Sequence, residues 1–163
     1  MARSRKRPRI LIAGIGNVLL MDDGVGVHAV EELKMNPPPN CLIAEVGTAT
    51  FNALHLFEWA DKILAIDAMQ AGGSPGTLYS FTLSDIEERG PQTSLHELNL
   101  IAALRLLNRS LPETLVLGVE PETINYGLEL SPSVKASLPH LVQTTKKIVA
   151  QWKRHWTQSL LSF

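Results

Sequence analysis

The fold class is decided by the stretch Arg9-Ile-Leu-Ile-Ala-Gly-Ile-Gly-Asn17, which runs on into Val18-Leu-Leu-Met-Asp-Asp-Gly-Val-Gly26. Its first part is apolar and rich in β-forming residues, which predicts a buried strand over residues 9–13 that ends at the two glycines. Residues from about 24 to 34 carry a largely apolar face at helical spacing, which predicts a helix. A buried strand that turns into a helix is the opening unit of an α/β fold.

The same alternation continues along the chain. Further apolar runs predict strands at residues 41–46, 62–67, 77–81 and 114–119. Helices are predicted at residues 51–59, at 95–107, and from the cap Ser131-Pro132 to about residue 156, with Pro139 as a bend or a restart. We therefore expect one α/β domain over residues 1–163, with three layers and a mostly parallel, twisted, five-stranded sheet that carries helices on both faces.

Composition and charge are ordinary for a globular protein. Hydrophobic residues make up 45% of the chain, and 15 basic and 16 acidic residues give a formal net charge of -1, so nothing favours nucleic acid or an anionic membrane as a partner. The single cysteine, Cys41, excludes an internal disulfide and a cysteine-cluster metal site. We find no export signal and no apolar run of the ~20 residues that a spanning helix needs. We expect a cytoplasmic protein whose basic start, residues 1–8, is a frayed terminus rather than a targeting or RNA-binding arm.

Acidic and imidazole side chains stand where ligands bind in such sheets, beyond the carboxyl ends of the strands. Asp22 and Asp23 follow the first strand, Asp67 ends the third, and His96 lies in the first turn of a predicted helix. Two carboxylates and an imidazole suit a divalent ion such as zinc or nickel. Paired carboxylates also suit acid–base chemistry, because a shared site splits their pKa values.

Each of these residues also has a purely structural interpretation. One of the two adjacent aspartates can cap the following helix. Asp67 can be a turn residue, and His96 can be a surface histidine. Spacing alone does not show that the side chains meet, so both interpretations stay open.

The turn Gly14-Ile-Gly16 invites comparison with a dinucleotide-binding loop. The fingerprint Gly-x-Gly-x-x-Gly needs a glycine at position 19, where this chain has Leu19. We expect the glycines to permit a tight turn through which the backbone approaches a site. Glu120-Pro-Glu122, after the last strand, lies at the same edge and either shapes the site or only ends the strand.

Taken together, the motifs resemble the hydrogenase maturation endopeptidase family. The similarity begins with the block at residues 12–26 and continues in family order through Gly47-Thr48, Ile66-Asp67-Ala68, Gly76-Thr77, Ser94-Leu-His96, Gly118-Val-Glu-Pro-Glu122 and Leu130-Ser131-Pro132. These blocks span about residues 9–150. One departure is Val46, where the family usually has a glycine or another small residue before Gly47-Thr48.

The resemblance implies an activity and a site. Members remove a C-terminal extension from the large subunit of a nickel-iron hydrogenase once its metal centre is loaded. Their three metal-binding positions map onto Asp23, Asp67 and His96. The resemblance thus implies an endopeptidase, either aspartic-type through Asp23 and Asp67 or metal-assisted, whose partner is the large-subunit precursor. The substrate is expected to supply the nickel, and zinc or cadmium is expected to fit the site in vitro. Residues expected to bind substrate or shape the site are Gly14, Gly16, Asn17, Asp22, Gly47, Thr48 and Glu120.

Two other functions fit the same fold, because a fold alone does not determine a function. One is a nickel- or precursor-binding chaperone that does not cleave. The other is a nucleotide-dependent α/β enzyme, against which Leu19 stands.

Overall fold

Five strands form one sheet in the computed structural model, which describes residues 7–161. The strands are β1 (Ile10–Ile15), β2 (Cys41–Gly47), β3 (Lys62–Ala68), β4 (Leu78–Thr82) and β5 (Glu113–Val119), in the order β2-β1-β3-β5-β4. Every pairing is parallel except that of β4 with β5. The predicted mostly parallel five-stranded sheet is confirmed.

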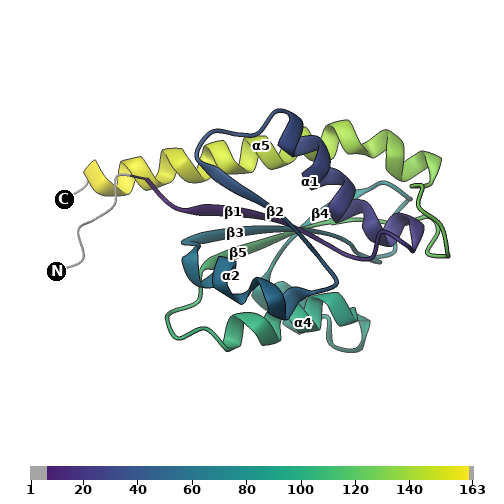
Figure 1. Cartoon of the computed structure of the whole chain (residues 1–163), viewed down its shortest axis with the longest axis horizontal. Coiled ribbons are helices and arrows are strands. Elements are labelled where there is room, and N and C mark those ends of the chain that lie inside the picture. Colours follow the sequence, from purple (N-terminus) through teal and green to yellow (C-terminus); the bar gives the residue numbers. More distant parts are fainter. Residues whose placement is uncertain (1–6, 162–163) are drawn as a thin grey trace.

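Helices cover both faces of this sheet (Figure 1). On one face lie α1 (Val25–Met35) and α5 (Pro132–Leu161), and on the other lie α2 (Leu54–Trp59) and α4 (Leu95–Arg105). Alternate residues of β1 supply the two cores: Ile10 and Ile12 pack with α1 and α5, whereas Leu11 and Ala13 pack on the opposite side. A central strand buried on both faces must be apolar throughout, which is why β1 appears in the sequence as an unbroken apolar run.

The helices differ from the prediction in three places. The segment 51–59 begins as a 3-10 helix (Thr50–Ala53) before α2. The short helix α3 (Leu83–Glu88), which begins with a capping box between Thr82 and Asp85, is not predicted at all. The restart at Pro139 is wrong, because α5 continues through this residue, and its buried positions Leu141, Val149 and Trp152 pack in the core. Tertiary packing here outweighs the lost backbone hydrogen bond of one proline.

The N-terminal residues of the chain were predicted to be frayed over residues 1–8. Residues 1–6 of the predicted frayed start lie outside the described residues, and Pro8 is buried. Arg9 is anchored, because its backbone N–H donates to Asp61 at 2.8 Å.

Within residues 7–161, none of the helices combines the length and the apolar character needed to cross a membrane.

Glycines allow α1 to meet the sheet backbone to backbone. A Cβ atom on Gly26 would lie 2.0 Å from the carbonyl oxygen of Ile66 and 2.4 Å from that of Ile15. A Cβ atom on Gly14 would lie 2.4 Å from the carbonyl oxygen of Gly26. The start of α1 is therefore held against the carboxyl ends of β1 and β3, and the chain that connects β1 to α1 lies across this edge.

The buried carboxylate of Asp22 ties this connection to the segment between β5 and α5. Asp22 is fully buried and accepts hydrogen bonds from the backbone N–H groups of Glu122 at 2.9 Å, Thr123 at 2.9 Å and Ser131 at 2.7 Å. The hydroxyl of Ser131 donates a fourth bond at 2.7 Å. The Ser131 side chain predicted to cap α5 thus bonds Asp22. Asp22 itself does not cap α1, whose N-cap residue is Gly24.

Replacing Gly26 tests the close contact of α1 with the sheet. Gly26→Ala should lower the free energy of unfolding by about 3 kcal/mol, because the added methyl group overlaps two backbone carbonyls that cannot both retreat. Urea denaturation measures the change. Glu31→Ala, at an exposed position of the same helix, should stay within about 0.5 kcal/mol of the wild type. Equal stabilities of the two variants would show that the contact is not tight.

Removing the Asp22 carboxylate tests the link between the β1–α1 connection and the segment between β5 and α5. Asp22→Ala should cost about 3 kcal/mol or more, because three backbone N–H groups, that of Ser131 buried and the others partly buried, lose their acceptor together. The matched control is Asp85→Ala, which removes an exposed carboxylate from the capping box of α3 and should cost about 1 kcal/mol. A urea midpoint for the Asp22 variant no lower than that of the control would contradict the assignment.

Candidate functional site

The candidate site lies at the carboxyl edge of the sheet, where Asp23 and His96 meet. Asp23 belongs to the 3-10 helix η1 (Met21–Gly24) that follows β1, and His96 lies in the first turn of α4. The two residues are 73 positions apart, yet Asp23 Oδ2 lies 3.0 Å from His96 Nε2. The same oxygen accepts the backbone N–H of Asn17 at 2.9 Å. Both side chains are mostly buried, so the contact is shielded from solvent.

Asp67 completes the group from the end of β3. Its side chain is buried, and Oδ1 accepts the backbone N–H of Ala68 at 2.8 Å. Gly16 brings the connection after β1 alongside it: a Cβ atom on Gly16 would lie 3.2 Å from Asp67 Oδ1 and 1.9 Å from the carbonyl oxygen of Asp23. The φ angle of Gly16 is +116°, in a region that other residues avoid. Glycine at this position is therefore a requirement of the site.

Burial and charge drive the two carboxylates toward opposite protonation states. Burial favours the neutral form of Asp23, but the hydrogen bonds from His96 and Asn17, together with the charge of His96, outweigh it and hold the pKa of Asp23 below its usual value. Burial raises the pKa of Asp67 well above its usual range, and the negative charge of Asp23 adds to this rise, while the charge of His96 opposes it. The pKa of Asp23 therefore lies below that of Asp67, so that at a pH between the two values Asp23 is charged and Asp67 is protonated.

The imidazole of His96 responds to the same charges. Its hydrogen bond to Asp23 raises the pKa of His96, burial opposes the rise, and the negative charges of Asp67, Asp23 and Glu97 add to it. The raised pKa of His96 and the lowered pKa of Asp23 both favour the charged form of this pair, in which the imidazolium donates to the carboxylate.

Other predicted residues hold chain segments around Asp23, Asp67 and His96 in place. Glu120 is buried, and its Oε2 accepts the hydroxyl of Tyr79 at 2.9 Å and the backbone N–H of Ala71 at 2.8 Å, so it holds the loop after β3. Gly47, with a φ angle of +59°, accepts the backbone N–H of Gly16 at 3.1 Å. Thr48 is exposed. Of the residues predicted from the sequence, only Asp23, Asp67 and His96 form the charged group itself.

The donor chemistry suits a divalent ion, but the donors are not arranged as a closed cage. Two carboxylates and an imidazole are ligands that zinc and nickel accept. Across residues 7–161, however, no three His, Cys, Asp or Glu side chains are grouped so that they could hold an ion. His96 directs Nε2 at Asp23 instead. Ligation by His96 thus requires this contact to open and the ring to lose a proton.

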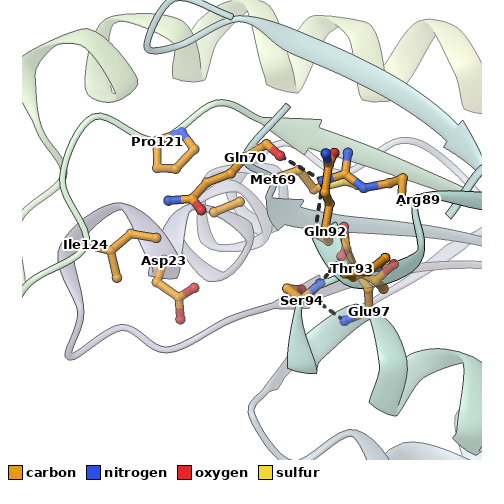
Figure 2. Close-up of a pocket in the computed structure, with 12 residues that line it drawn as sticks. Asp23, Met69, Gln70, Arg89, Gln92, Thr93, Ser94, Glu97, Pro121 and Ile124 are labelled. Carbon is orange, nitrogen blue, oxygen red and sulfur yellow. Dashed lines mark hydrogen bonds between the residues drawn. The ribbon is translucent and has the colours of Figure 1, made fainter. Parts of the chain in front are cut away.

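A cleft of about 400 Å³ opens beside Asp23 (Figure 2). Its walls come from residues 68–70 after β3, from the segment that leads into α4, and from Pro121 and Ile124. Arg89 and Glu97 line it as well, and neither was predicted from the sequence. The Ser94-x-x-Glu97 capping box could have been recognised, but nothing in that pattern indicates a cleft.

Comparison with known proteins places the chain in one family. The family model described as hydrogenase maturation protease matches residues 27–148. A hydrogenase expression/formation protein, HupD from Bradyrhizobium diazoefficiens, is 30% identical over 160 residues, which cover 93% of this chain and 83% of that protein.

Two solved structures share the fold. The hydrogenase-maturating endopeptidase HybD from E. coli superposes with a TM-score of 0.78 at 26% identity, over 88% of this chain and 93% of that one. The [NiFe] hydrogenase maturation protease HybD from Thermococcus kodakarensis gives 0.75 at 30% identity, over 86% of this chain and 99% of that one. The chain belongs to the hydrogenase maturation protease family.

Proposed function

We propose that this protein is the endopeptidase that removes the C-terminal extension of a nickel-iron hydrogenase large-subunit precursor after nickel loading. The observation that carries the proposal is the meeting of Asp23 and His96, with Asp67 buried beside them, at the rim of a cleft. Family membership supports peptidase activity. A cytoplasmic site of action and the precursor as partner are part of the same proposal.

The nickel belongs to the substrate in this proposal. Asp23, Asp67 and His96 add ligands to an ion that the precursor's thiolates already hold, so that only loaded precursor is processed. The open arrangement of the three side chains suits this role better than that of a permanent metal centre, because a resident ion requires a preformed set of ligands. Zinc or cadmium, which accept the same donors, can occupy the site in vitro.

Cleavage requires a water molecule to be activated and the leaving amine to be protonated. The opposed pKa shifts support a division of labour: ionised Asp23 takes a proton from the water, and protonated Asp67 supplies one toward the scissile bond. In the alternative, the water is activated by the substrate's nickel, and the aspartates serve only as ligands.

Single substitutions test the cleavage. Asp23→Asn, Asp67→Asn and His96→Ala should each slow the shortening of nickel-loaded precursor by about 100-fold or more, because each removes a group that the reaction uses. Nickel-free precursor should stay uncut by the wild type. The matched controls are Glu31→Gln and His140→Ala, at exposed helix positions, which should cleave normally. Full activity in all three site variants would refute the proposal, and wild-type protein that only co-purifies with loaded precursor would favour a chaperone.

The electrostatic coupling of Asp23 with His96 makes a separate prediction. Because its main cause is the hydrogen bond to Asp23, the raised pKa of His96 should appear as an NMR titration midpoint above 6.5, the usual value for histidine. Asp23→Asn should move that midpoint down. Metal binding should weaken as the pH falls through the same midpoint, since a protonated ring cannot ligate. A His96 midpoint at or below 6.5 in the wild type would contradict the coupling.

A further inference from the structure

Two buried polar atoms without hydrogen-bond partners belong to residues that line the cleft beside Asp23. Among residues 7–161 the structure leaves four buried side-chain N or O atoms unpartnered: His28 Nε2, Thr50 Oγ1, Arg89 Nε and Glu97 Oε1. The last two belong to residues that line this one cleft (Figure 2). Since buried polar groups in native proteins are nearly always paired, a donor and an acceptor left unpaired on one cleft call for an explanation.

Glu97 provides the clearer case. The residue is only 2% exposed. Its Oε2 accepts the backbone N–H of Ser94 and closes the capping box that begins α4, which accounts for that oxygen. Its Oε1 has no such task. A carboxylate oxygen kept from water without a donor is costly, and an N–H group brought by a ligand would supply the missing donor.

Arg89 supplies the complementary atom. Its Nη2 donates to the carbonyl oxygen of Gln70 at 2.7 Å and, more weakly, to that of Gln92 at 3.4 Å, and its guanidinium lies over the ring of Phe81 at 5.3 Å. These contacts fix the side chain and leave Nε as an unused donor. An acceptor and a donor held in one cleft match the N–H and C=O groups of an extended peptide.

We propose that this cleft binds the precursor's main chain next to the scissile bond, with a peptide N–H donating to Glu97 Oε1 and a peptide C=O accepting from Arg89 Nε. The inference rests on the proposed function and adds the subsite that holds the peptide. Both atoms are buried in the structure, so residues that line the cleft must shift when the segment binds. Glu97 is a binding residue in this scheme, because it holds the peptide without touching the reacting atoms.

Glu97→Gln is the decisive variant, because glutamine retains one oxygen for the Ser94 N–H and puts an NH₂ donor where the unpartnered acceptor stands. We expect an unchanged urea midpoint and a KM for loaded precursor raised about 10-fold or more, as befits a lost hydrogen bond to a charged group. The control is Asp85→Asn, the equivalent carboxylate-to-amide change at the N3 position of the α3 capping box. Asp85 does not line the cleft. The change should leave KM unaltered.

A semisynthetic precursor identifies the partner group. Replacing single peptide N–H groups near the scissile bond by ester oxygens should reveal one position that raises KM for the wild type but not further for Glu97→Gln. An unchanged KM in Glu97→Gln, or ester effects that simply add to that variant, would overturn the inference.

Direct binding separates this outcome from failure of the proposed function. If the wild type binds loaded precursor without cutting it, the proposed function fails, yet Glu97→Gln should still raise the Kd about 10-fold. If the wild type cuts normally and Glu97→Gln binds and cuts equally well, only the subsite is refuted.

Discussion

The buried carboxylate of Asp22 is the interaction on which the site depends. Four donors from residues that follow β5 converge on it, so the connection after β1 and the segment before α5 are locked together across the carboxyl edge of the sheet. The glycine contacts of α1 hold the same connection against β1 and β3. Because Asp22 is held from one side, its neighbour Asp23 is presented to His96. Two adjacent aspartates thereby acquire separate tasks, one structural and one chemical.

Asp23 and Asp67 lie in unequal environments, which shift their pKa values in opposite directions. Two hydrogen bonds favour the ionised form of Asp23, whereas burial favours the protonated form of Asp67, and the imidazole lies within the field of both. Such a group can move protons, but its histidine is bound to Asp23 and not yet available to a metal. An ion brought by a substrate must compete with that contact. This competition gives a physical reason for an activity that depends on a loaded precursor, in keeping with our proposal.

The strands were predictable because short apolar runs that are rich in β-forming residues and bounded by turn residues are typical of strands. Short polar helices and hydrogen bonds between distant residues were harder to predict from the sequence. The helix α3 is short and polar, and the hydroxyl of Ser131 was expected at a helix cap, although its partner Asp22 lies 109 residues away. Nor could spacing alone show that Asp23 meets His96; the family resemblance joined them, and the structure places them in contact. The cleft residues Arg89 and Glu97 escaped notice because an unpartnered atom is a property of the fold, not of a motif.

Nickel X-ray absorption spectroscopy tests the central claim most directly. Spectra of nickel-loaded precursor would be recorded alone, with the wild-type protein under conditions that trap the complex, and with His96→Ala. The account predicts that binding of the wild type adds nitrogen or oxygen ligands to the thiolate-bound nickel, and that the nitrogen contribution disappears with the variant. A nickel spectrum that binding leaves unchanged would contradict the claim that Asp23, Asp67 and His96 recognise the metal.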